Sequence, residues 1–220
     1  MIFCIRDFLD AEQIRIIKEK LDAVLWRDGA ATAGWHAKLV KNNQQARSRD
    51  EAAAEITESV KEKALAHPLF RAAARPKRFG PVMVNRYADG MGYGTHVDDA
   101  LMGDLRTDVS FTLFLDDPAS YAGGDLVIEE TSGELAYKLD AGSMILYPAT
   151  SLHRVEPVTS GQRRAIVGWT QSFVRAPERR QILFDIEQAR MGVFDRAGKT
   201  AEFDLLSKSL SNLLRMWADA

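Results

Sequence analysis

The hydrophobic positions near the N-terminus recur at helical spacing. A capping-box pattern opens at Asp10, and apolar residues follow it every three or four positions. The pattern predicts a helix that begins after Asp10 and ends before Asp28. A second run of the same spacing predicts a helix over 50–65. Between the two, glycine and asparagine indicate a loop over 30–47 with one strand at 37–40.

Short apolar runs separated by turn residues fill the centre of the chain, from about residue 79 to residue 173. Many short strands at this spacing are typical of a sandwich or a barrel, and the mouth of a jelly roll is wide enough to hold a metal. The sequence therefore predicts a mainly β fold with flanking helices and a jelly-roll core. The expected strands lie at 81–87, 95–98, 109–115, 126–129, 143–147 and 164–173.

The C-terminal part returns to helical spacing, with helices expected over 178–191 and 204–219. The second of these carries an apolar stripe that must be covered, because a short helix alone is marginal in water. We expect the stripe to form a homodimer by meeting its own copy, with docking on the barrel or the N-terminal helices of the same chain as the alternative. The stripe consists of Leu206, Leu210, Leu213 and Trp217.

Composition and charge limit the kinds of partner and compartment that we expect for this protein. The chain has 220 residues and a formal charge of −2, which gives no support for nucleic-acid or anionic-membrane binding. Cys4 is the only cysteine, so neither an internal disulfide nor a multi-cysteine metal site can form within the chain. Arg6 and Asp7 interrupt the apolar start, and no run approaches the ~20 apolar residues of a membrane span. We therefore expect a cytoplasmic protein.

The candidate chemistry lies in His96-Val97-Asp98, followed much later by His153 and Arg163. In a strand, residues two apart point the same way, so His96 and Asp98 can reach one ion. Two histidines and one carboxylate form the facial triad of non-heme Fe(II) oxygenases, with His153 supplied by another strand. The fork of Arg163 suits a carboxylate, as needed if an open metal position holds a dicarboxylate.

A lone His-x-Asp pair also fits a hydrogen-bonded couple on a surface strand. A glycine-permitted turn precedes this pair, and two of only four histidines fall where a triad needs them, so the context favours a metal site. Strand alternation points Asp99 and Arg164 away, although a one-residue slip would exchange Arg164 for Arg163. Tyr87 and Tyr93 are expected as wall residues, and one hydroxyl could donate to a bound carboxylate.

Several stretches together resemble the bacterial PKHD-type hydroxylases, which are Fe(II)- and 2-oxoglutarate-dependent dioxygenases of the prolyl-4-hydroxylase-like superfamily. The resemblance spans nearly the whole chain. It rests on residues 26–29, 32–34, 41–43, 85–98, 123–126, 152–163 and 212–218.

The resemblance implies a double-stranded β-helix with His96, Asp98 and His153 as the iron ligands. It makes Arg163 the partner of the distal carboxylate of 2-oxoglutarate, and Tyr87 is the candidate helper. Some relatives place a tyrosine on the strand here expected at 109–115 to help hold the same carboxylate. That strand carries phenylalanines instead, so the helper must differ or be absent.

The implied activity is hydroxylation of an unidentified substrate by O2, with release of succinate and CO2 from 2-oxoglutarate. The resemblance further implies L-ascorbate (vitamin C) as a reductant and a link to iron uptake. The residues alone are also compatible with two other functions: a non-redox metal enzyme on a cupin-like barrel, or an iron or 2-oxoglutarate sensor without turnover. The chain is divided into a catalytic domain with the N-terminal helices, 1–177, and a helical extension, 178–220.

Overall fold

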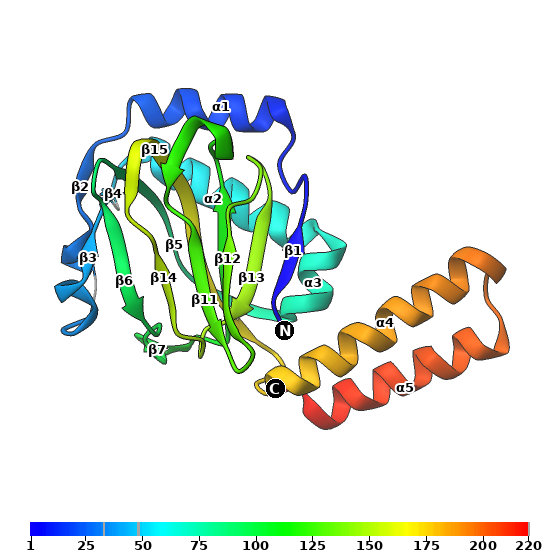
Figure 1. Ribbon diagram of the computed structural model, residues 1–220. Coiled ribbons are helices and arrows are strands. Elements are labelled where there is room, and N and C mark those ends of the chain that lie inside the picture. The colour runs from blue at the N-terminus through cyan, green and yellow to red at the C-terminus, as the bar shows by residue number, and fades with distance from the viewer. Residues whose placement is uncertain (33, 48, 220) are drawn as a thin grey trace.

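Two antiparallel sheets face each other and form the centre of the molecule (Figure 1). The computed structural model describes residues 1–219 apart from 33 and 48. The larger sheet runs in the order β1 (Phe3–Ile5), β13 (Met144–Pro148), β9 (Val109–Phe114), β15 (Val158–Ser172), β5 (Pro76–Ala88), β4 (Gln44–Ala46) and β2 (Trp26–Asp28), and β10 (Tyr121–Gly123) pairs with β15.

The smaller sheet carries the strands that lead to the predicted metal site. Its order is β12 (Gly133–Tyr137), β11 (Leu126–Glu130), β14 (His153–Val155), β6 (Gly92–His96) and β3 (Lys41–Asn42), and β7 (Leu101–Met102) and β8 (Leu105–Arg106) form a separate hairpin. The mainly β architecture with flanking helices is confirmed. Among the described residues, no helix is long and apolar enough to cross a membrane.

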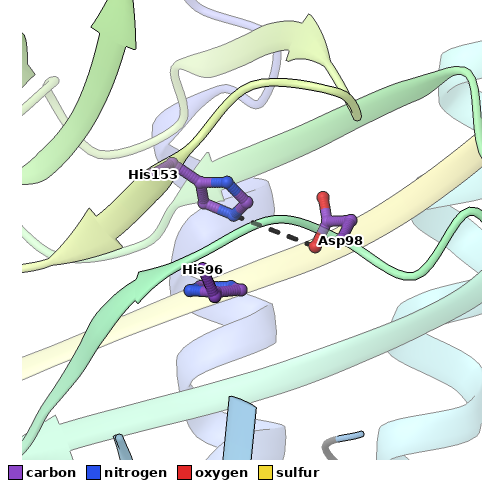
Figure 2. Close-up of side chains that lie close together, drawn as sticks. All are labelled: His96, Asp98 and His153. Atoms are coloured by element: carbon purple, nitrogen blue, oxygen red, sulfur yellow. Dashed lines mark ion pairs between the residues drawn. The ribbon is translucent and has the colours of Figure 1, made fainter. Parts of the chain in front are cut away.

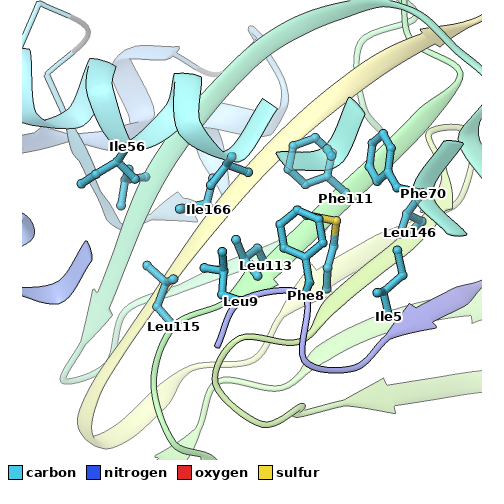
Figure 3. Close-up of a cluster of buried hydrophobic side chains, with 14 of the residues drawn as sticks. Ile5, Phe8, Leu9, Ile56, Phe70, Phe111, Leu113, Leu115, Leu146 and Ile166 are labelled. Carbon is cyan, nitrogen blue, oxygen red and sulfur yellow. The ribbon is translucent and has the colours of Figure 1, made fainter. Parts of the chain in front are cut away.

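Three helices cover the outer face of the larger sheet: α1 (Ala11–Asp22), α2 (Glu51–Ala66) and α3 (Pro68–Ala74). The capping box at the start of α1 is present, because the Asp10 side chain accepts from the Gln13 backbone N–H at 2.8 Å and the Gln13 side chain accepts from the Asp10 N–H at 3.1 Å. Apolar side chains of helices and sheet pack into one core, part of which Figure 3 shows.

Side-chain alternation along β9 separates this helix-side core from the interior of the barrel. Val109, Phe111 and Leu113 belong to the core beneath the helices. Ser110 and Thr112, between them, line a cavity enclosed by the two sheets. A strand whose residues are all buried can therefore present an apolar face to the helices and hydroxyls to the interior.

The C-terminal helices α4 (Pro177–Ala197) and α5 (Ala201–Trp217) form a hairpin that projects from the barrel (Figure 1). Leu210 is 4% exposed and packs with Val174 and Leu183. Leu213 and Trp217 pack at the edge of the same cluster. Leu210, Leu213 and Trp217 of the predicted stripe therefore pack on α4 and the segment before it. The homodimer stays a prediction.

Two local expectations are wrong. The strand expected at 37–40 is a short 3₁₀ helix, η2 (Ala37–Leu39), which sets the Val40 carbonyl to accept from the Gly94 N–H at 2.9 Å. The strand expected at 95–98 ends at His96. The first helix does end before Asp28, at Asp22, and β2 follows it and pairs with β4.

Candidate active site

The three predicted ligands meet between the sheets, as Figure 2 shows. His96 on β6 and His153 on β14 are directly paired across neighbouring strands, which brings their ring centroids to 4.3 Å. Asp98 follows the end of β6, and its Oδ1 lies 3.8 Å from His153 Nε2. One potential ligand atom from each residue lies within 4.8 Å of the other two.

Each of these side chains is oriented by a hydrogen bond on the atom that would not face a metal. His96 Nδ1 lies 2.8 Å from the carbonyl oxygen of Gly94, and His153 Nδ1 lies 3.0 Å from that of Ser151. The hydroxyl of Ser110 donates to Asp98 Oδ2 at 2.6 Å. Both Nε2 atoms and Oδ1 are left free, which is how partners behind the ligands prepare a metal site.

The surroundings of His96 keep its imidazole neutral, which is the form that binds a metal. Burial lowers the pKa of His96 to about 4, and the neighbouring His153 adds to the effect. The ring of Tyr93 stacks on His96 with a centroid distance of 3.6 Å. His96 is therefore neutral at physiological pH and offers a nitrogen lone pair, so the donor set fits Fe(II).

A cavity of about 350 Å³ opens beside the three ligands. The strands of the larger sheet contribute its other wall, where Tyr87 and Arg163 lie side by side on β5 and β15. The Arg163 guanidinium carbon lies 5.2 Å from the ring centroids of Tyr87 and Phe114. Metal ligands and a cation thus share one enclosed space.

Arg163 is 1% exposed, and its Nε and Nη2 have no hydrogen-bond partner among the described residues. A buried guanidinium without a partner is costly, because five N–H donors have left water. An anion bound in the cavity would satisfy it. The orphaned donors therefore fit a carboxylate such as that of 2-oxoglutarate.

Of the two neighbouring alternatives, Arg164 lies outside the cavity, whereas Asp99 lines it without joining the ligand cluster. Arg164 faces the helix side of the sheet, as Ile166 does, and its Nη2 pairs with Asp116 Oδ1 at 2.7 Å. Asp99 is exposed at the edge of the cavity, and its backbone carbonyl accepts from Thr107 Oγ1 at 2.6 Å. The predicted strand register, with Arg163 inside, is thus the one present.

Three further residues of the site were not foreseen from the sequence. Ser110 holds Asp98 from the opposite sheet, and Lys41 lines the cavity from the N-terminal segment. Tyr147 lies edge-on to His153 with a centroid distance of 5.0 Å, and burial raises the pKa of its hydroxyl. Their places depend on strand pairing across the whole chain, for which no local signal exists.

The comparisons with known proteins agree with this site. The family described as the 2OG-Fe(II) oxygenase superfamily matches residues 82–171, which include all three ligands and Arg163. Two structures share the fold: a Pseudomonas putida prolyl-4-hydroxylase (TM-score 0.55, 20% identity, 78% of this chain and 92% of that one) and a Trichoplax adhaerens prolyl hydroxylase (TM-score 0.57, 14% identity, 83% and 86%). The fold is therefore the jelly roll of these oxygenases.

The class defined by fold and site is the Fe(II)- and 2-oxoglutarate-dependent dioxygenases. Relatives that align over their full length narrow this class to one family. PKHD-type hydroxylases of Gloeothece citriformis and Acaryochloris marina are each 50% identical to this chain, and each alignment covers 100% of both proteins. The chain belongs to the PKHD-type hydroxylase family. Its cofactor is Fe(II) and its cosubstrates are 2-oxoglutarate and O2, which decides among the three functions left open by the residues.

Proposed function

We propose that His96, Asp98 and His153 hold the iron and that Arg163 binds the distal carboxylate of 2-oxoglutarate. The observation that carries this proposal is the buried guanidinium of Arg163, whose Nε and Nη2 have no partner among the described residues, in the same cavity as the three ligand atoms. Tyr87 stands beside Arg163 and is 2% exposed, so its ring shields that charge from water.

The protein hydroxylates a prime substrate and releases succinate and CO2. Bound iron and 2-oxoglutarate supply the oxidising chemistry, and the protein supplies orientation. The hydrogen bonds of Gly94 and Ser151 to the two imidazoles keep both Nε2 atoms aimed at one point. The resemblance supports, without naming a substrate, a role linked to iron uptake and L-ascorbate as the reductant.

We further propose that residues 1–177 form the catalytic domain and residues 178–220 an extension. The projecting hairpin of α4 and α5 supports this division, since Leu183 and Leu210 form a small cluster of their own with Val174, while Phe184 of α4 joins the hairpin to the core of the barrel. We place the protein in the cytoplasm, with no nucleic acid or membrane among its partners. The near-balanced charge of −2 and the lone cysteine support this.

Succinate formation tests the proposal directly. Protein reconstituted with Fe(II) without oxygen is mixed with 2-oxoglutarate and O2, and both succinate formation and oxygen consumption are measured. We expect the two to rise together in the parent protein and to fall to background in His153→Ala, since one imidazole ligand is missing. Near-normal succinate formation in a folded His153→Ala protein would remove this residue from the metal site.

A further inference from the structure

One wall of the cavity comes from a segment outside the residues that match the oxygenase superfamily. It comprises η1 (Gly29–Thr32), η2 and β3, and it contributes Thr32, Gly34, Ala37 and Lys41 to the lining. Pairing of β3 with β6 holds the segment in place, with Lys41 opposite Tyr93. The proposed roles of the metal ligands and Arg163 leave this wall without a function.

Lys41 presents a cation to the cavity. Its Nζ donates to Thr32 Oγ1 at 3.2 Å and lies 5.0 Å from the ring centroid of Tyr93. Among the described residues, no carboxylate forms an ion pair with it. Thr32 Oγ1 in turn bonds Gln45 Oε1, which fixes the hydroxyl. One of three ammonium donors is thereby used, and two stay available to a ligand.

The charges around Lys41 do not neutralise it once the site is loaded. Burial lowers its pKa to about 8, Asp98 and Asp28 act in the opposite direction, and Arg27 lowers it further. In the metal-free protein the side chain still carries its charge for most of the time at neutral pH. Asp98 is committed to the metal in the proposed site, so its charge is no longer free to balance the ammonium.

The cosubstrate does not use Lys41 either. Lys41 and Arg163 are the only lysine and arginine among the described residues that line the cavity. In the proposed function Arg163 takes the distal carboxylate of 2-oxoglutarate, and the iron takes the other end. A second, separate cation is therefore left facing the space that the prime substrate must enter.

We propose that Lys41 contacts an anionic group, a carboxylate or a phosphate, on the prime substrate and thereby selects acidic substrates. The inference rests on the proposed function. The hydroxyl of Thr32 orients the ammonium, and the ring of Tyr93 covers it, so the contact is directed and partly shielded from water. The N-terminal wall is then the part of the chain that recognises the substrate.

The test uses oxygen-18 gas and a cell extract as the probe. Holoenzyme with Fe(II) and 2-oxoglutarate is incubated with the extract, and mass spectrometry identifies products other than succinate that carry one labelled oxygen atom, since succinate takes up the second atom of O2. Succinate is measured in the same reaction. The ratio of labelled product to succinate is compared among the parent, Lys41→Met, Lys41→Arg and Lys38→Met. Lys38 is the matched control, because it is an exposed lysine of the same segment that does not line the cavity.

We expect the labelled product to carry a carboxylate or phosphate. The ratio should fall by about tenfold or more in Lys41→Met, as for a lost hydrogen bond to a charged group. Lys41→Arg should retain most of it, and Lys38→Met all of it. A product without an anionic group, a parental ratio in Lys41→Met, or an equal loss in Lys41→Arg would each overturn the proposal. Succinate formation by the parent reports the proposed function separately.

Discussion

Removing the hydroxyl of Ser110 should weaken the metal site although the residue is not a ligand. Ser110 lies on β9 of the larger sheet and is 2% exposed, and it donates to Asp98 Oδ2 at 2.6 Å. In Ser110→Ala this carboxylate oxygen loses its donor. Because the Asp98 side chain is 6% exposed, water has little access to replace the bond. Asp98 is then free to turn, and the position of Oδ1 is no longer fixed.

The expected loss follows from what such partners contribute. Removing a hydrogen-bond partner behind a metal ligand typically costs about 10–100-fold in metal affinity. This corresponds to about 1.4–2.8 kcal/mol at about 1.4 kcal/mol per factor of ten. Leaving a buried acceptor unsatisfied costs about 1–3 kcal/mol, a similar range. We therefore expect the Kd for Fe(II) to rise by one to two orders of magnitude.

The assay is an oxygen-free titration with Fe(II) in competition with a chelator, alongside thermal unfolding of the metal-free protein. Ser143→Ala is the matched control, because Ser143 is also buried, at 4% exposure, but does not line the cavity. Ser143→Ala should bind Fe(II) as the parent does. If Ser110→Ala is folded and its Kd for Fe(II) stays within about twofold of the parent, well below the range expected for such a partner, the reasoning about Asp98 is wrong.

Three further predictions address other parts of the chain. Arg163→Ala should weaken 2-oxoglutarate binding by about 100-fold or more in calorimetry while Fe(II) binding changes far less, since breaking a buried pair costs about 3–5 kcal/mol; equal 2-oxoglutarate affinity would refute the anchor. The product-to-succinate ratio should decline as pH rises through the pKa of Lys41, which burial lowers from its ordinary value, because only the protonated form attracts an anion; a ratio that does not change with pH would contradict a role for the charge. Truncation before Glu202 should change a dimer to a monomer in light scattering if α5, besides packing on α4, joins two copies; an unchanged size would refute the homodimer.

The convergence of His96, Asp98 and His153 could be predicted because the signal is local and chemical. The spacing of His96 and Asp98 indicated one ion, although β6 ends at His96 and Asp98 reaches the site from the segment that follows. The expectation that both side chains reach one point holds despite this difference, since their ligand atoms lie within 4.8 Å of each other. The choice of Arg163 over Arg164 could also be made, because alternation along a strand leaves only one of the two inside.

The remaining contributors could not be predicted, for a physical reason. Ser110 meets Asp98 only because the larger sheet packs over the smaller one, and Lys41 reaches the cavity only because β3 pairs with β6. Neither residue carries a pattern of its own. A serine in an apolar strand and a lysine in a loop are ordinary, and their roles come from contacts between segments far apart in the sequence.

The two sheets position different residues of the site. His96 and His153 are set by the pairing of β6 with β14 in the smaller sheet, whereas Arg163 is set by the pairing of β15 with β5 in the larger one. Each pairing fixes its own residues independently. The distance from the proposed metal site to the proposed carboxylate anchor therefore depends on how the sheets pack, and the Ser110–Asp98 hydrogen bond links the larger sheet to the segment that follows β6. If 2-oxoglutarate spans iron and Arg163 as proposed, its binding tests the packing of the whole barrel, not one strand.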